Sequence, residues 1–99
     1  CRWGGLDEFR GSDADVVVHA TPVGMEPDTR SLLSASDFRA GTTVFDLVYT
    51  PPETPLIRAA KEAGCETIPG TEMFVHQAVA QFRLMTGIRV TPELVREML

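Results

Sequence analysis

The sequence predicts an α/β domain, namely half of a doubly wound parallel sheet with about three strands and closing C-terminal helices. Short apolar runs alternate with helical patterns along the chain. These runs are continuous, which is typical of strands covered on both faces, as in a parallel sheet. Alternating strands and helices also imply right-handed crossovers between parallel strands.

The first half of the chain predicts two strands separated by turns. Residues 16–20 (VVVHA) form the predicted first strand, and the prolines and glycine of residues 21–27 exclude a long element after it. Residues 31–38 could hold a short helix. Residues 42–49 are rich in β-branched and aromatic side chains and predict the second strand.

The second half predicts three helices around a short third strand at residues 65–68. Thr54-Pro55 predicts a helix start, and Gly64 supplies its stop. A long helix is expected from about Thr71 to Thr86, ended by Gly87, and Thr91-Pro92 caps a last helix. We expect these apolar side chains of the helices to face inward: Leu56, Ile57, Ala60 and Ala63; Val75, Ala78, Val79, Phe82 and Met85; and Leu94, Val95 and Met98.

The composition is that of a folded globular chain with an acidic surface. Of 99 residues, 43% are apolar and 23% are charged, with a net charge of −5. The basic residues are scattered, so we expect no nucleic-acid partner, and no apolar run is long enough for a membrane helix. Cys1 and Cys65 show no disulfide or metal spacing, which predicts no metal site and two free thiols in a reducing cytoplasm. Because residue 1 is not Met, we expect a piece of a longer protein.

Ligands of open α/β sheets bind beyond the carboxyl ends of the strands. Those ends carry residues 20–25 (ATPVGM), residues 46–51 (DLVYTP) and residues 69–74 (PGTEMF). At 100° per residue, Gly70, Met73 and Gln77 lie within about 60° of one another, away from the apolar stripe of the long helix. Gln77 therefore either hydrogen-bonds a ligand at the strand ends or is simply solvated.

Three further side chains each have two interpretations. Tyr49 either offers its hydroxyl to a ligand or packs as a surface aromatic. Asp46 is either an acid or base, or the acceptor of backbone N–H groups in a turn. His19 is better explained as a hydrogen-bonded core residue than as a catalyst. The sequence contains no dinucleotide-binding glycine motif, Walker loop or nucleophile elbow, so the residues by themselves name no reaction.

The three strand-end motifs in series closely resemble the shikimate dehydrogenase family. The matching segments are residues 20–25, residues 46–56 and residues 70–87, so the resemblance covers nearly the whole chain from Asp13. It implies an oxidoreductase that reversibly reduces 3-dehydroshikimate to shikimate with NADPH, in aromatic amino-acid biosynthesis. It also implies that residues 1–99 are the C-terminal portion of a Rossmann-like NADP-binding domain, whose Gly-rich phosphate loop and partner substrate domain lie outside this chain.

The resemblance further implies roles for individual residues. No residue of this chain is catalytic, because the family's catalytic Lys and Asp belong to the substrate domain, and the isolated chain is expected to be inactive. The cofactor NADP is expected at Thr21, Leu47, Gly70 and Met73, and shikimate at Tyr49 and Gln77.

The sequence also departs from the family and leaves other functions open. The family usually has Asn at the position of His19, and Glu72-Met73-Phe74 is similar to fused dehydroquinate dehydratase–shikimate dehydrogenases. A quinate/shikimate dehydrogenase or such a bifunctional enzyme is the alternative within the class, and a stand-alone non-catalytic binding module is the alternative outside it. We expect the isolated chain to self-associate through the open edge of its sheet.

Overall fold

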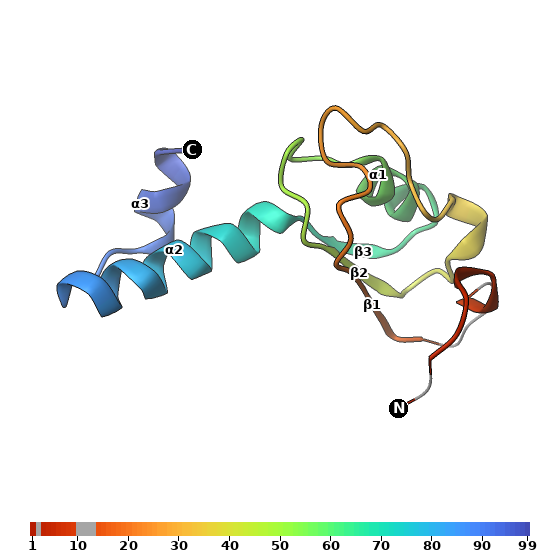
Figure 1. Ribbon diagram of the computed structural model, residues 1–99, viewed down its shortest axis with the longest axis horizontal. Coiled ribbons are helices and arrows are strands. Elements are labelled where there is room, and N and C mark those ends of the chain that lie inside the picture. Colours follow the sequence, from red (N-terminus) through yellow and green to blue (C-terminus); the bar gives the residue numbers. More distant parts are fainter. Residues whose placement is uncertain (2, 10–13) are drawn as a thin grey trace.

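The computed structural model describes residues 1, 3–9 and 14–99 (Figure 1). Within these residues, one parallel sheet has the strand order β1-β2-β3, which confirms the predicted fold class. Its strands are β1 (Val16–His19), β2 (Thr43–Asp46) and β3 (Glu66–Ile68). The helices are α1 (Pro55–Glu62), α2 (Gly70–Thr86) and α3 (Pro92–Glu97), with 3₁₀ turns η1 (Leu6–Phe9) and η2 (Ala35–Asp37).

The register of the sheet brings the ends of β1 and β2 together. His19 lies opposite Asp46, and because side chains alternate along a strand, both point to the same face of the sheet. A hydrophobic core lies on this face, where β2 meets α1. Its buried members are Leu33, Val44, Leu56 and Ala60.

The opposite face of the sheet is open, so the expectation of strands covered on both faces is wrong. Val16 and Val18 are 59% and 57% exposed, and Ile68 is 40% exposed. A continuous apolar run shows that a strand can be buried on both sides, but burial also needs an element packed against each side. The elements that the structure describes leave these three side chains largely open to solvent.

Helix boundaries follow the predicted capping residues. The Thr54 hydroxyl accepts the N–H of Ile57 at the start of α1, and the Thr91 hydroxyl accepts the N–H of Leu94 at the start of α3. Gly87 ends α2 in the left-handed region, with φ of 76°. Each cap depends only on residues close in sequence, which is why the sequence predicts it.

Several elements are shorter than predicted. The helix expected over residues 31–38 is only the 3₁₀ turn η2, where the Asp37 carboxylate accepts the backbone N–H of Ser34. The second strand ends at Asp46 rather than at residue 49, because the Asp46 carboxylate accepts the N–H of Val48 and turns the chain.

Helices α2 and α3 form an arm that projects from the sheet (Figure 1). The radius of gyration is 15.4 Å, against about 13 Å for a compact chain of 100 residues. The apolar stripe of α2 is consequently covered only at its start. Val75 is 1% exposed, whereas Phe82 and Met85 are 42% and 85% exposed. The inward burial predicted for the last two is wrong, because α2 runs beyond the sheet. None of the described helices combines the length and apolarity needed to cross a bilayer.

An apolar groove and an ion pair join α3 to α2. The groove has a volume of about 450 Å³ and is lined by Phe74, Ala78, Phe82, Val90, Leu94, Val95, Met98 and Leu99. Leu94 and Met98 line this groove but stay 47% and 80% exposed, because α2 packs against them on one side only. Beside the groove, Arg96 donates two hydrogen bonds to the Glu72 carboxylate, at 2.6 and 3.2 Å.

Leu56→Ala should lower the free energy of unfolding by about 2–5 kcal/mol, because Leu56 is buried in the core beneath β2. Leu84→Ala is the matched control, since Leu84 is 86% exposed on α2, and it should change stability by less than about 0.5 kcal/mol. Urea denaturation of both variants measures the difference. Equal losses would contradict the position of the core.

Acid should weaken the attachment of α3. Hydrogen bonds from Arg96 hold the pKa of Glu72 below its ordinary value of 4.5. A lowered pKa means that the stabilisation is complete above the ordinary value and is lost as the pH falls through the lowered one. Hydrogen exchange of the α3 amides across this range measures the loss. In Glu72→Gln, α3 should exchange faster at neutral pH and respond less to acid; an unchanged acid response in that variant would exclude the pair as its cause.

Candidate functional site

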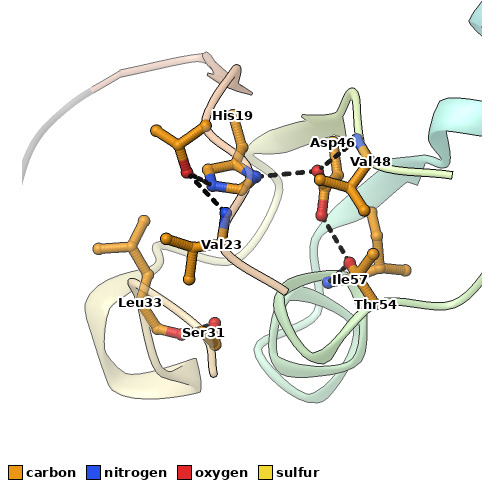
Figure 2. A network of polar contacts seen from close by, with 9 residues as sticks. His19, Val23, Ser31, Leu33, Asp46, Val48, Thr54 and Ile57 are labelled. Carbon is orange, nitrogen blue, oxygen red and sulfur yellow. Dashed lines mark hydrogen bonds and ion pairs between the residues drawn. The ribbon is translucent and has the colours of Figure 1, made fainter. Parts of the chain in front are cut away.

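The carboxylate of Asp46 organises the carboxyl ends of the strands. Asp46 is fully buried. Its Oδ1 accepts the N–H of Val48 at 2.9 Å, and its Oδ2 accepts the hydroxyl of Thr54 at 2.6 Å (Figure 2). His19 Nδ1 lies 2.9 Å from the same Oδ1. Of the two interpretations of Asp46, the structure therefore shows the acceptor in a turn, here with two further partners.

His19 links this carboxylate to the loop after β1. Figure 2 shows the imidazole between Asp46 on one side and the loop carrying Val23 on the other. Its Nε2 hydrogen-bonds the hydroxyl oxygen of Thr21, which also accepts the N–H of Val23 at 3.3 Å. His19 is only 7% exposed, so the predicted hydrogen-bonded core role is confirmed.

A cavity of about 230 Å³ opens beside this network at the strand ends. Its lining comes from the loops after β1 and β2: Ala20, Thr21, Pro22, Met25, Leu47, Val48, Tyr49 and Thr50. The structure thus brings together three of the six predicted site residues, which are Thr21, Leu47 and Tyr49. All eight lining side chains are uncharged, so the cavity suits an uncharged, largely apolar group better than a phosphate.

The start of α2 lies directly against the end of β2. A Cβ atom built on Gly70 would lie 2.5 Å from the carbonyl oxygen of Val48 and 2.6 Å from that of Leu47. Only glycine allows this approach without a shift of the backbone. One turn along α2, the Phe74 ring packs on Tyr49, with 5.1 Å between ring centroids. The fourth predicted residue, Gly70, therefore fixes where the helix meets the cavity wall.

The remaining two predicted residues stand on α2 rather than in the cavity lining. Met73 is half-buried and Gln77 is exposed, so the predicted orientation of Gln77 away from the core is confirmed. Gln77 follows Phe74 by three positions, which makes the two side chains neighbours on one side of the helix. Through Phe74 and Tyr49, that side of α2 is continuous with the rim of the cavity.

The sequence missed several parts of the site. It did not identify the Tyr49–Phe74 ring contact, the cavity position of Met25, or the direct bond between His19 and Asp46. The sequence placed both residues near the carboxyl ends of predicted parallel strands, but their pairing depends on a strand register that the pattern does not specify.

A positively charged side chain close to the cavity, that of Arg30, is already paired with a carboxylate. Arg30 follows the cavity loop, and its guanidinium donates to the Asp28 carboxylate at 2.7 and 2.9 Å. These bonds lower the pKa of Asp28 to about 2. Across the described ranges, no three His, Cys, Asp or Glu side chains gather as a metal ion would require.

Gly70→Ala should destabilise the fold by about 1–3 kcal/mol, because the added methyl group would overlap two backbone carbonyls. At an unobstructed helical position, the same change stabilises by up to about 1 kcal/mol. The sign of the change in unfolding free energy, measured in urea, therefore tests the contact. A stabilised variant would show that α2 does not approach the end of β2 this closely.

Comparison with known proteins gives one consistent family. The family profile described as "Shikimate 5'-dehydrogenase C-terminal domain" matches residues 70–99. Shikimate dehydrogenase (NADP(+)) of Methanosarcina mazei is 43% identical over 86 residues, which cover 86% of this chain and 31% of that protein. Quinate/shikimate dehydrogenase (NAD(+)) of Corynebacterium glutamicum is 45% identical over 84 residues, covering 85% of this chain and 30% of that protein.

The three-dimensional structure of this chain is also similar to solved structures of shikimate dehydrogenases. Shikimate 5-dehydrogenase from Thermus thermophilus, solved in complex with NADP(H) and shikimate, matches 97% of this chain with a TM-score of 0.80 and 35% identity. The match covers 38% of that structure, and the chain spans about a third of the length of the curated relatives it matches. Over most of its length, this chain is therefore similar in both sequence and fold to shikimate dehydrogenases.

Proposed function

We propose that this chain is part of an enzyme that reversibly reduces 3-dehydroshikimate to shikimate with NADPH. In this proposal, residues 1–99 are the C-terminal portion of its NADP-binding domain, and the enzyme acts in the cytoplasm. The observation that carries the proposal is the uncharged cavity at the strand ends, where Thr21, Leu47 and Tyr49 meet beside the start of α2. Its position is where open α/β sheets bind ligands.

The cavity fits the nicotinamide end of the cofactor and not its phosphates. A volume of about 230 Å³ and an apolar, uncharged lining suit a flat ring that must be shielded from water. We assign the ring's surroundings to Thr21, Leu47, Gly70 and Met73. Nothing basic lines the cavity, so the pyrophosphate of the cofactor would be held by other parts of the enzyme.

Two residues are assigned to the substrate. Tyr49 lines the cavity and is half-exposed, and the exposed Gln77 lies on the adjoining side of α2. Both can hydrogen-bond the hydroxyl groups of shikimate. When bound, the reduced cofactor supplies a hydride to the keto carbon. The part played by Tyr49 and Gln77 is to hold that carbon in line with the ring, a contribution of proximity and orientation.

No residue of this chain is assigned to proton transfer. Asp46 and His19 lie beside the loops that line the cavity, and both are committed to hydrogen bonds in the buried network. The proton that the carbonyl oxygen needs would come from a Lys and Asp of the substrate domain, and the isolated chain would be inactive. The open edge of β1 remains our proposed route for self-association of that isolated chain.

A quinate/shikimate dehydrogenase that uses NAD is the second candidate, because the Corynebacterium relative with that name is 45% identical. Turnover of shikimate and of quinate, each with NADP+ and with NAD+, separates the two. Binding of these ligands without turnover by the full-length protein would instead support a non-catalytic binding module. If the full-length protein neither turns over nor binds any combination of these substrates and cofactors, both dehydrogenase functions and the binding module are contradicted.

Gln77→Ala and Tyr49→Phe in the full-length protein should each raise the KM for shikimate about fivefold, the effect of losing one neutral hydrogen bond of about 1 kcal/mol. The KM for the cofactor should stay unchanged. Gln81→Ala is the matched control, because Gln81 is also exposed on α2, one turn further from the cavity. Steady-state kinetics with unchanged KM values in both variants would remove these residues from the substrate site.

A further inference from the structure

The hydrogen-bond chain Asp46–His19–Thr21 has a fixed direction. Ionised Asp46 can only accept, and its partners Val48 N–H and the Thr54 hydroxyl both donate to it. The Thr54 hydroxyl gives its hydrogen to Oδ2, because a carboxylate oxygen has none to give, while the hydroxyl oxygen accepts the N–H of Ile57. Asp46 Oδ1 must therefore accept a hydrogen bond from His19 Nδ1. The opposite arrangement would bring two unprotonated acceptors to 2.9 Å in a buried site, which is strongly unfavourable.

The tautomer of His19 then determines what Thr21 can offer. With the proton on Nδ1, the Nε2 of neutral His19 is an acceptor. While His19 is neutral, the Thr21 hydroxyl gives its single hydrogen to Nε2, and its oxygen already accepts the N–H of Val23. No hydrogen is left for a ligand. What remains is one lone pair on an exposed residue that lines the strand-end cavity.

We propose that His19 is a positioning residue that holds the Thr21 hydroxyl as an acceptor, so that this corner of the cavity selects a ligand group bringing its own N–H or O–H. A carboxylate or phosphate oxygen at Thr21 would face another acceptor and is disfavoured. The fixed acceptor deepens the proposed function and rests on it for the ligand. Within that function, the donor comes either from the nicotinamide carboxamide or from a hydroxyl group of shikimate.

The tautomer is tested directly by long-range ¹H–¹⁵N NMR on the full-length protein at neutral pH, with no ligand present. We expect Nδ1 of His19 to be protonated and Nε2 to be unprotonated. His76 is exposed on α2 and serves as the internal comparison for an imidazole in water. The His19 signals are assigned by the shift of Nε2 in Thr21→Val and by their persistence in His76→Gln. A protonated Nε2 on His19 would overturn the proposal whatever the protein binds.

Two cofactors distinguish whether the group that donates a hydrogen bond to Thr21 is the nicotinamide carboxamide or a shikimate hydroxyl. Thr21→Val should weaken NADP+ binding about fivefold and leave unchanged the binding of 3-acetylpyridine adenine dinucleotide phosphate, in which a methyl group replaces the carboxamide NH2. If the donor is a shikimate hydroxyl, both cofactors should bind as before and the KM for shikimate should rise by that factor. Thr21→Ser keeps the hydroxyl and should restore the wild-type values.

These outcomes separate the proposal from the proposed function. The measured quantities are NADP+ binding, binding of the acetylpyridine analogue and the KM for shikimate. If Thr21→Val changes none of them, the acceptor role is overturned, even if the unmutated protein is an active dehydrogenase. Failure of the unmutated protein to bind NADP+ and to turn over shikimate would overturn the proposed function and, with it, the assignment of the donor. The protonation state of His19 would still decide whether Thr21 is held as an acceptor.

Discussion

A buried carboxylate, that of Asp46, is the interaction on which the rest of the site depends. An ionised group without solvent contact is tolerated only when hydrogen-bond donors surround it. Here the donors come from three parts of the chain: His19 at the end of β1, Val48 in the turn after β2, and Thr54 at the start of α1. Satisfying one carboxylate therefore sets the relative positions of two strand ends and a helix. The walls of the cavity are the loops that leave these strand ends.

A second constraint acts from the other side of the cavity and involves backbone rather than charge. Gly70 lets the first turn of α2 approach the carbonyls of Leu47 and Val48, and the Tyr49–Phe74 ring contact continues that interface. The cavity is thus bounded by a hydrogen-bonded network at the end of β1 and by close packing at the end of β2. Both are rigid supports, which a binding site needs if it is to orient two ligands.

The features that the sequence predicted are those set by neighbouring residues. The caps at Thr54 and Gly87 are local, and so is the helical spacing that turned Gln77 away from the core. The strand-end motifs gathered Thr21, Leu47 and Tyr49 correctly because parallel strands present their carboxyl ends at one edge.

The features it missed depend on partners distant in sequence. Burial of Val18 or Met85 requires another element to cover them, and apolar spacing does not supply one. The bond between His19 and Asp46 depends on strand register, which periodicity leaves unspecified. The contact of Phe74 with Tyr49 depends on the angle at which α2 leaves the sheet, which no pattern within the helix records.

The anchoring of α2 at one end only makes the helix a lever. Its 17 residues extend about 25 Å at 1.5 Å per residue. A tilt of about 10° around Gly70 would displace the far end by about 4 Å but would move Gln77, only about 10 Å from the pivot, by about 2 Å. Such a tilt would therefore move Gln77 less than the far end of the helix, while Gly70 stays in place. The geometry gives the proposed cofactor side of the cavity a fixed wall and the proposed substrate side an adjustable one.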